Sequence, residues 1–105
     1  MASTQDYVEY VCDNIKGLGI ITNKKMFGEY MVYVNAKPIV LICDNTCYIK
    51  MKDEISEYMN GCPTGHPYNG AKLHYILDVE EKETTSKVIP LLERITPLPK
   101  SRGKK

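Results

Sequence analysis

The pattern of apolar and polar positions predicts an antiparallel sheet through the middle of the chain. Aromatic and β-branched residues are concentrated in segments that end at turn-forming residues, as is typical of strands. We predict strands at residues 25–34, 39–43, 46–51 and 73–79. The connections Asn35-Ala36-Lys37-Pro38 and Asp44-Asn45 both resemble hairpin turns, so the first three strands should pair in order.

Helical spacing of apolar residues occurs at both ends of the chain. Residues 4–16 should form a helix that Ser3 or Thr4 caps and Gly17 ends. Its apolar stripe consists of Val8, Val11, Cys12 and Ile15. A C-terminal helix should carry the stripe Val88, Leu91, Leu92 and Ile95. Because Pro90 lacks an amide proton, this helix either begins near Ser86 or kinks.

A short third helix is expected between the strands. It should begin at Asp53, end at Gly61 and turn Ile55, Tyr58 and Met59 inward. With 105 residues the chain fits one domain, which we place at residues 1–99. The expected fold class is α+β, with an antiparallel, meander-like sheet of about four to five strands packed against the N- and C-terminal helices.

Charge separates the C-terminal end from the rest of the chain. The formal net charge is +1, but residues 1–99 hold ten basic and thirteen acidic residues, a charge of −3. Residues 100–105 are expected to be a disordered basic tail, with Lys100, Arg102, Lys104 and Lys105. These four side chains offer weak contacts to nucleic-acid phosphates. We expect a cytoplasmic protein, since neither a signal peptide nor a membrane-spanning run is evident.

The first predicted strand is apolar on both of its faces. One face carries Met26, Tyr30, Val32 and Val34. The other carries Phe27, Glu29, Met31 and Tyr33. If helices cover the first set, then the second set needs another cover: a partner protein, a second copy of the chain, or a loop.

The cysteines and one histidine suggest a zinc site that their predicted arrangement does not support. Cys43, Cys47, Cys62 and His66 have a spacing that a zinc site could use. However, a two-residue loop at Asp44-Asn45 would pair Cys43 with Thr46 and turn Cys47 to the opposite face. We therefore expect no zinc and no other cofactor.

No catalytic arrangement is evident, and we expect a protein that is not an enzyme. His74 could pair with Asp78 or Glu29, but no nucleophile or oxyanion site accompanies it. No small-molecule substrate is indicated. The loop from Cys62 to Gly70 is either a recognition loop or a simple connector. As a recognition loop it would use Pro67, Tyr68 and Gly70.

Several sequence motifs resemble one bacterial family. These are M-x-G-E-Y-x-x-Y at residues 26–33, the Asp44-Asn45 turn, YIK at residues 48–50 and PYNGAK at residues 67–72. Together with the order of elements they resemble the N-terminal domain of the TfoX/Sxy competence regulators over roughly residues 5–96, as a free-standing single domain. Ala36, Cys43 and Cys47 depart from the pattern, which affects the turn type and the local packing.

The resemblance implies a regulatory or adaptor protein that acts through protein contacts, in transcription or DNA-uptake control. The candidate partner-binding residues are Phe27, Gly28, Glu29, Tyr30, Met31 and Tyr33. The partner is expected to be another protein or a second copy, giving a dimer. Two alternatives are a weak nucleic-acid binder that uses the basic tail and a thiol- or zinc-dependent protein.

Overall fold

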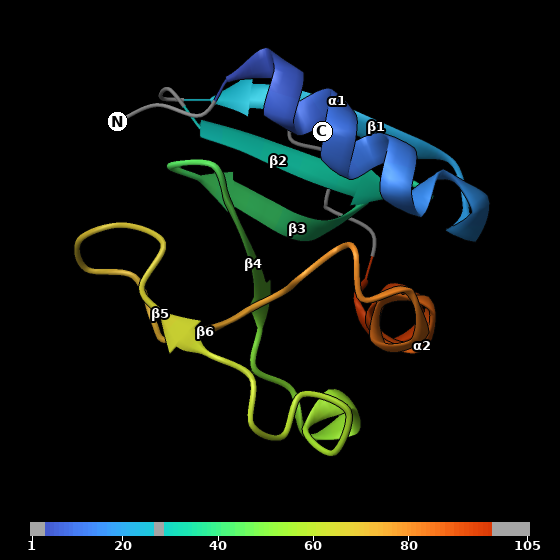
Figure 1. Ribbon diagram of the computed structural model, residues 1–105, viewed down its shortest axis with the longest axis vertical. Coiled ribbons are helices and arrows are strands. Elements are labelled where there is room, and N and C mark those ends of the chain that lie inside the picture. The colour runs from blue at the N-terminus through green and yellow to red at the C-terminus, as the bar shows by residue number, and fades with distance from the viewer. Residues whose placement is uncertain (1–3, 27–28, 98–105) are drawn as a thin grey trace, which may run out of the picture.

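The computed structural model describes residues 4–26 and 29–97, which form one sheet and two helices (Figure 1). The helices are α1 (Gln5–Ile15) and α2 (Lys82–Ile95), and short 3-10 turns occupy Lys16–Leu18 and Asp53–Ile55. The strands are β1 (Ile21–Met26), β2 (Glu29–Val34), β3 (Lys37–Cys43), β4 (Thr46–Lys50), β5 (Thr64–Gly65) and β6 (His74–Ile76). The predicted α+β class is confirmed, with six strands where four to five were expected.

The sheet is antiparallel throughout, in the order β1-β2-β3-β4-β6-β5. The single strand predicted at residues 25–34 is wrong, because two strands pair there with Met26 opposite Glu29. Phe27 and Gly28 lie outside the described residues. The apolar pattern did not predict β1 as a separate strand, because β1 is a polar edge strand that carries Lys24 and Lys25. Charged residues on edge strands discourage pairing with other chains.

Two tight turns connect β2, β3 and β4. Asn35 and Ala36 have φ angles of 52° and 70°, and Asp44 and Asn45 have 53° and 55°. Positive φ at both central residues defines the type I′ turn, whose twist matches that of the flanking strands. The Asp44-Asn45 turn pairs Cys43 with Thr46 as predicted. Cys43 and Cys47 therefore belong to opposite faces of the sheet.

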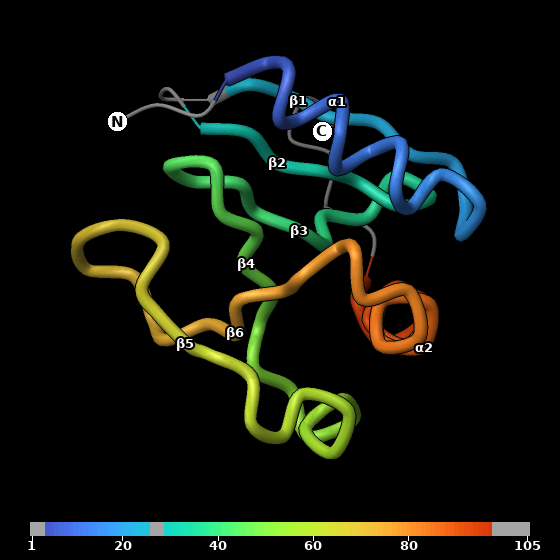
Figure 2. The backbone as a smooth tube through the Cα atoms, in the orientation of Figure 1, coloured from blue at the N-terminus to red at the C-terminus, as the bar shows by residue number. Residues whose placement is uncertain are grey.

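Both helices contribute to a single core on one face of the sheet. Figures 1 and 2 show α1 lying along β1 and β2, while α2 is seen end-on beside β3. The helices supply Val8, Val11, Ile15, Val88, Ile89 and Leu92 to this core. The central strands supply Tyr30, Val32, Val34, Val40, Ile42, Cys47 and Ile49. The Thr4 hydroxyl caps α1 by accepting from the Tyr7 amide at 3.2 Å.

Three other expectations need correction. The helix predicted from Asp53 to Gly61 is a 3-10 turn followed by irregular turns, and Tyr58 is exposed while Ile55 and Met59 are buried. The last strand is only His74–Ile76, because Leu77 and Val79 leave the sheet to enter the core. Part of the 62–70 loop pairs with it as β5.

The ends of both main helices also differ from expectation. α2 starts at Lys82 and continues past Pro90, whose side chain is exposed. Burial of Thr85, together with Val88, Ile89 and Leu92, accounts for the early start. Gly17 does not end α1 in a left-handed conformation. The 3-10 turn follows instead, and Gly19 has the positive φ of 154°.

Candidate functional site on the open face of the sheet

The face of the sheet opposite the helices carries a row of half-buried side chains. Met31 pairs with Leu41, Leu41 with Tyr48, and Tyr48 with Ile76, so the row crosses β2, β3, β4 and β6. Direct cross-strand partners project to the same side of a sheet. We call this side the open face, and its residues include Glu29, Met31, Tyr33, Leu41, Tyr48, Lys50, His74 and Ile76.

The loop after β5 turns part of the open face into a groove. The groove has a volume of about 290 Å³, and Tyr68 lines it together with Met31, Leu41 and Tyr48. Pro67 is buried and fixes the loop to the domain, while Tyr68 remains 59% exposed. The amide of Ala71 donates to the Tyr68 carbonyl at 3.0 Å. Because the buried Pro67 holds the loop in place, the Tyr68 ring can remain exposed and is not needed for folding.

Lysines surround the apolar part of the open face. Lys50 and Lys72 line the groove, and Lys24 on β1 lies directly opposite Met31. An adjoining hollow adds Lys52, beside the exposed side chains of Met51 and Leu73. No carboxylate is among the residues that line either hollow in the described part of the chain. The groove is therefore apolar at its centre and cationic at its rim.

Hydrogen bonds to the backbone hold the histidines in place. The Nδ1 atom of His74 lies 2.7 Å from the Lys72 carbonyl oxygen, and its ring meets Tyr48 edge-on with centroids 6.5 Å apart. The Nδ1 atom of His66 lies 2.8 Å from the Ala71 carbonyl oxygen. A nitrogen bonded to a backbone carbonyl orients the ring and shapes the loop.

Glu29 forms a hydrogen bond within its own chain. Its Oε1 atom accepts from the Asp44 amide at 3.3 Å, which ties the start of β2 to the turn after β3. The pKa of the neighbouring Cys43 thiol is raised to about 12, mainly by burial and also by the charge and hydrogen bonding of Glu29. Tyr30, the next motif residue, is only 8% exposed and belongs to the core.

The structure brings together some of the predicted site residues and separates others. Met31 from the motif and Tyr68 from the loop meet in the groove, while Tyr33 lies on the same face and Gly70 turns the loop with a φ of 90°. The tail residues Lys100, Arg102, Lys104 and Lys105 lie outside the described residues. The alternative zinc ligands do not form a site, since no group of three histidine, cysteine, aspartate or glutamate side chains within residues 4–26 and 29–97 is arranged to hold a metal ion.

Sequence reasoning missed most of the groove lining, including Leu41, Tyr48, Lys50 and Lys72. A signal was available in β4, where Tyr48 and Lys50 alternate with the core residues Cys47 and Ile49. It did not stand out because a half-buried strand normally presents polar residues to water. Only the pairing of β4 with β3 and β6 aligns these side chains with apolar neighbours.

Comparison with known proteins shows a relative of this chain. No protein-family model matches the chain. Within the described segments, no helix combines the length and the apolar character needed to cross a membrane. The chain is 33% identical over 107 aligned positions to a protein of Spirochaeta aurantia named "Uncharacterized 12.7 kDa protein in trpE 5'region", and the alignment covers all of this chain and 93% of that protein. The chain therefore belongs to the same family as this Spirochaeta aurantia protein.

Proposed function

We propose that this protein is a non-enzymatic adaptor, similar to TfoX/Sxy N-terminal domains, whose open face binds an acidic and apolar segment of a partner protein. The observation that carries the proposal is the groove, in which Met31, Leu41 and Tyr48 form an apolar floor between lysines. Partly exposed apolar side chains that are continuous over several strands are characteristic of interaction surfaces. By the resemblance, the regulated process would be transcription or DNA uptake.

Binding accounts for these side chains better than catalysis does. Burial raises the pKa of the Cys43 thiol to about 12 and that of the Cys47 thiol to about 11, so both are protonated near neutral pH and are poor nucleophiles. Both histidines bond to backbone carbonyls of the loop at residues 66–74. A nucleophile needs a base within hydrogen-bond reach, and these contacts supply none.

The charge of the groove favours an acidic protein segment over a second copy of the chain. Two copies meeting at this face would bring Lys24, Lys50 and Lys72 against the same lysines, and repulsion would oppose the contact. A partner with carboxylates beside leucine or phenylalanine would match both the rim and the floor. Single-stranded nucleic acid is the competing ligand, because Tyr48 and Tyr68 are aromatic and lysines lie near them.

The experiment is selection of peptides from a random display library on the immobilised wild-type protein. Enriched peptides should combine apolar residues with aspartate or glutamate, and they should shift the amide resonances of Met31 and Tyr48. Met31→Glu places a carboxylate on the groove floor and should weaken the selected peptide by about tenfold or more. Lys50→Glu should weaken it by about two- to fivefold, as expected for a solvated ion pair.

The matched control is Lys87→Glu, the same charge change on the exposed side of α2. It should leave peptide affinity unchanged. Failure to enrich peptides on wild type over Met31→Glu would overturn the proposal. So would a thymidine oligonucleotide that binds the same residues more tightly than any peptide and loses affinity steeply with salt, because that result assigns the face to nucleic acid.

A further inference from the structure

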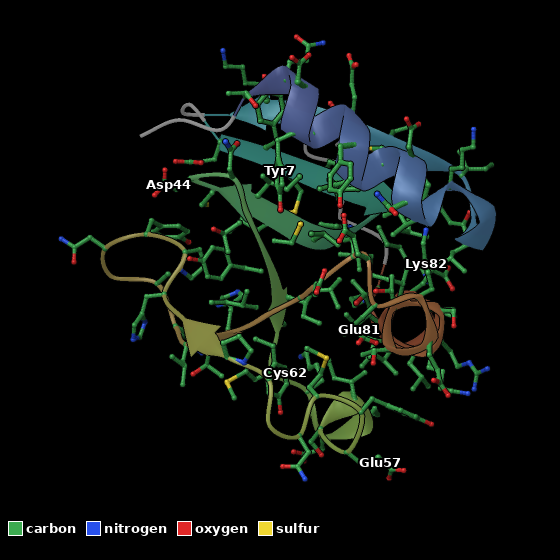
Figure 3. All side chains as sticks on the ribbon, viewed as in Figure 1. Tyr7, Asp44, Glu57, Cys62, Glu81 and Lys82 are labelled. Atoms are coloured by element: carbon green, nitrogen blue, oxygen red, sulfur yellow. The ribbon has the colours of Figure 1, made fainter. Side chains whose placement is uncertain are left out.

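Another hollow, the cleft, lies on the helix side of the sheet, under the N-terminal half of α1. It has a volume of about 360 Å³ and is bounded by α1, by β4 and by the segments that follow Met59 and Leu77. Figure 3 shows Tyr7 pointing down from α1 towards the interior, while Cys62 and Glu81 belong to the segments that follow Met59 and Leu77. The size is at the lower end of the range found for small-molecule sites.

The inner walls of the cleft are mostly apolar. Met59 and Leu77 are buried, and Cys47 and Cys62 add two thiols to the same lining. The hydroxyl of Tyr7 lies 3.5 Å from the Cys47 sulfur, which places one polar group at the inner end. Burial is the main reason that the pKa values of Tyr7 and Cys47 are raised, so both groups are neutral in the folded protein. An apolar ligand body would meet no charge there.

The mouth of the cleft is acidic. Asp78 and Glu81 are both exposed and both line it, and no lysine, arginine or histidine is among the lining residues of the described chain. The neighbouring Lys82 is not among the lining residues, and its ammonium donates to the Asn14 carbonyl at 3.0 Å. A ligand with a positive charge at one end would be attracted to this mouth.

We propose that the cleft binds a small amphipathic amine, with its ammonium group between Asp78 and Glu81 and its apolar body against Met59 and Leu77. The volume suits a body of one aromatic ring or a short aliphatic chain. The inference is independent of the adaptor function, because none of the residues that line the cleft lines the groove on the open face.

The test is an NMR titration of the full chain with 2-phenylethylamine and two ligands of similar shape, neutral 2-phenylethanol and anionic 3-phenylpropionate. The amine should bind in the millimolar range and shift the amides of Tyr7, Cys47 and Asp78. The alcohol should bind about threefold to fivefold more weakly, because it lacks the attraction to the two carboxylates. The acid should not bind.

The paired variant Asp78→Asn/Glu81→Gln should bind the amine only as well as wild type binds the alcohol. Asparagine keeps the oxygen that accepts from the Glu80 amide at 3.0 Å, so the local turn is preserved. The matched control is Glu57→Gln, an exposed carboxylate outside the cleft, and it should leave amine binding unchanged.

Three results would overturn the proposal: no shifts with the amine, shifts confined to residues outside the cleft, or equal binding of the amine and the alcohol by wild type. The comparison of the amine with the alcohol uses only the wild-type protein, so it tests the proposal even if the paired variant fails to fold. Peptide binding at the open face is measured separately, so failure of this test leaves the adaptor proposal standing.

Discussion

The two faces of the sheet use neighbouring residues of the same strands for different purposes. Val32 is completely buried against the helices, whereas Met31, one residue earlier, is half-buried on the open face. The covered side holds nearly all the fully buried apolar side chains, while the open side places lysines around a partly exposed groove. One alternating strand can therefore supply both the core that stabilises the fold and a surface that is available for binding.

The largest expected effect separates the two faces directly. Val32→Asp buries an unpaired carboxylate in the core and should cost about 4 kcal/mol or more of unfolding free energy. Met31→Glu leaves its charge half-exposed opposite Lys24 and should cost about 1 kcal/mol or less. Urea denaturation followed by circular dichroism measures both. Equal losses for the two variants would show that the open face is as essential to folding as the core.

The second prediction compares folding at alkaline pH with and without a core thiol. Burial raises the pKa of Cys47 from 9.0 to about 11, so folding favours the protonated thiol. This contribution is fully present below about pH 9 and is lost as the pH rises to about 11, an effect on the order of 2–3 kcal/mol. Urea midpoints between pH 8 and pH 11 should fall less steeply for Cys47→Ala than for wild type.

Cys43→Ala makes the same change as Cys47→Ala, but on the opposite face of the sheet. Burial and the neighbouring Glu29 together raise the pKa of Cys43 to about 12. The two cysteine variants should therefore both flatten the alkaline loss, and the double variant should flatten it most. An unchanged slope in all three variants would contradict the assigned burial of both thiols.

The third prediction strengthens the hairpin without altering either face. Ala36 has a φ of 70° in the turn between β2 and β3, a conformation that glycine adopts without strain. Ala36→Gly should raise the unfolding free energy by about 1 kcal/mol, measured by urea denaturation. The stabilised protein would be a suitable background for testing variants of the open face.

A glycine substitution in the turn between β3 and β4 should not raise the unfolding free energy in this way. Asn45 also has positive φ, but asparagine tolerates it better and its side-chain oxygen accepts from the Thr4 amide at 2.9 Å. Asn45→Gly should leave stability unchanged or lower it slightly. A gain equal to that of Ala36→Gly would show that relief of strain at Ala36 is not the cause.

The smallest expected effect concerns the aromatic wall of the groove. Tyr68 is 59% exposed, so Tyr68→Ala removes little buried area and should change the unfolding free energy by about 0.5 kcal/mol or less. Tyr30→Ala, on the core side, is the contrasting variant and should cost about 3 kcal/mol. Thermal unfolding of both variants checks this difference, and a large loss for Tyr68→Ala would show that the ring is part of the fold.

Sequence patterns predicted the residues that face the core more reliably than the ends of the elements. Val8, Val11 and Ile15 occupy the predicted side of the first helix, because a repeat of 3.6 residues is visible within one segment. Residues 21–24 were not recognised as part of a strand, since their polar composition suits the edge position that only pairing with β2 creates. The early start of α2 likewise depends on burial of Thr85.

The candidate site was predicted only where it depends on alternation within one strand. Met31 and Tyr33 were assigned to the uncovered face from alternation alone, and the register places them there. The meeting of Met31 with Tyr68 was not predictable, because it depends on how a loop more than thirty residues away crosses the sheet. The cleft was missed altogether, since Tyr7, Cys47 and Asp78 come from three distant segments.

Local sequence patterns were enough to predict the α+β class, the two hairpin turns and the inward side of β2, because each depends on neighbours within a few residues. Long-range packing sets which strand forms the edge, where Tyr68 lies, and that Asp78 and Glu81 share a cleft with Tyr7. These features depend on contacts between distant segments. Local propensity does not encode such contacts, because they form when the whole chain packs around one core.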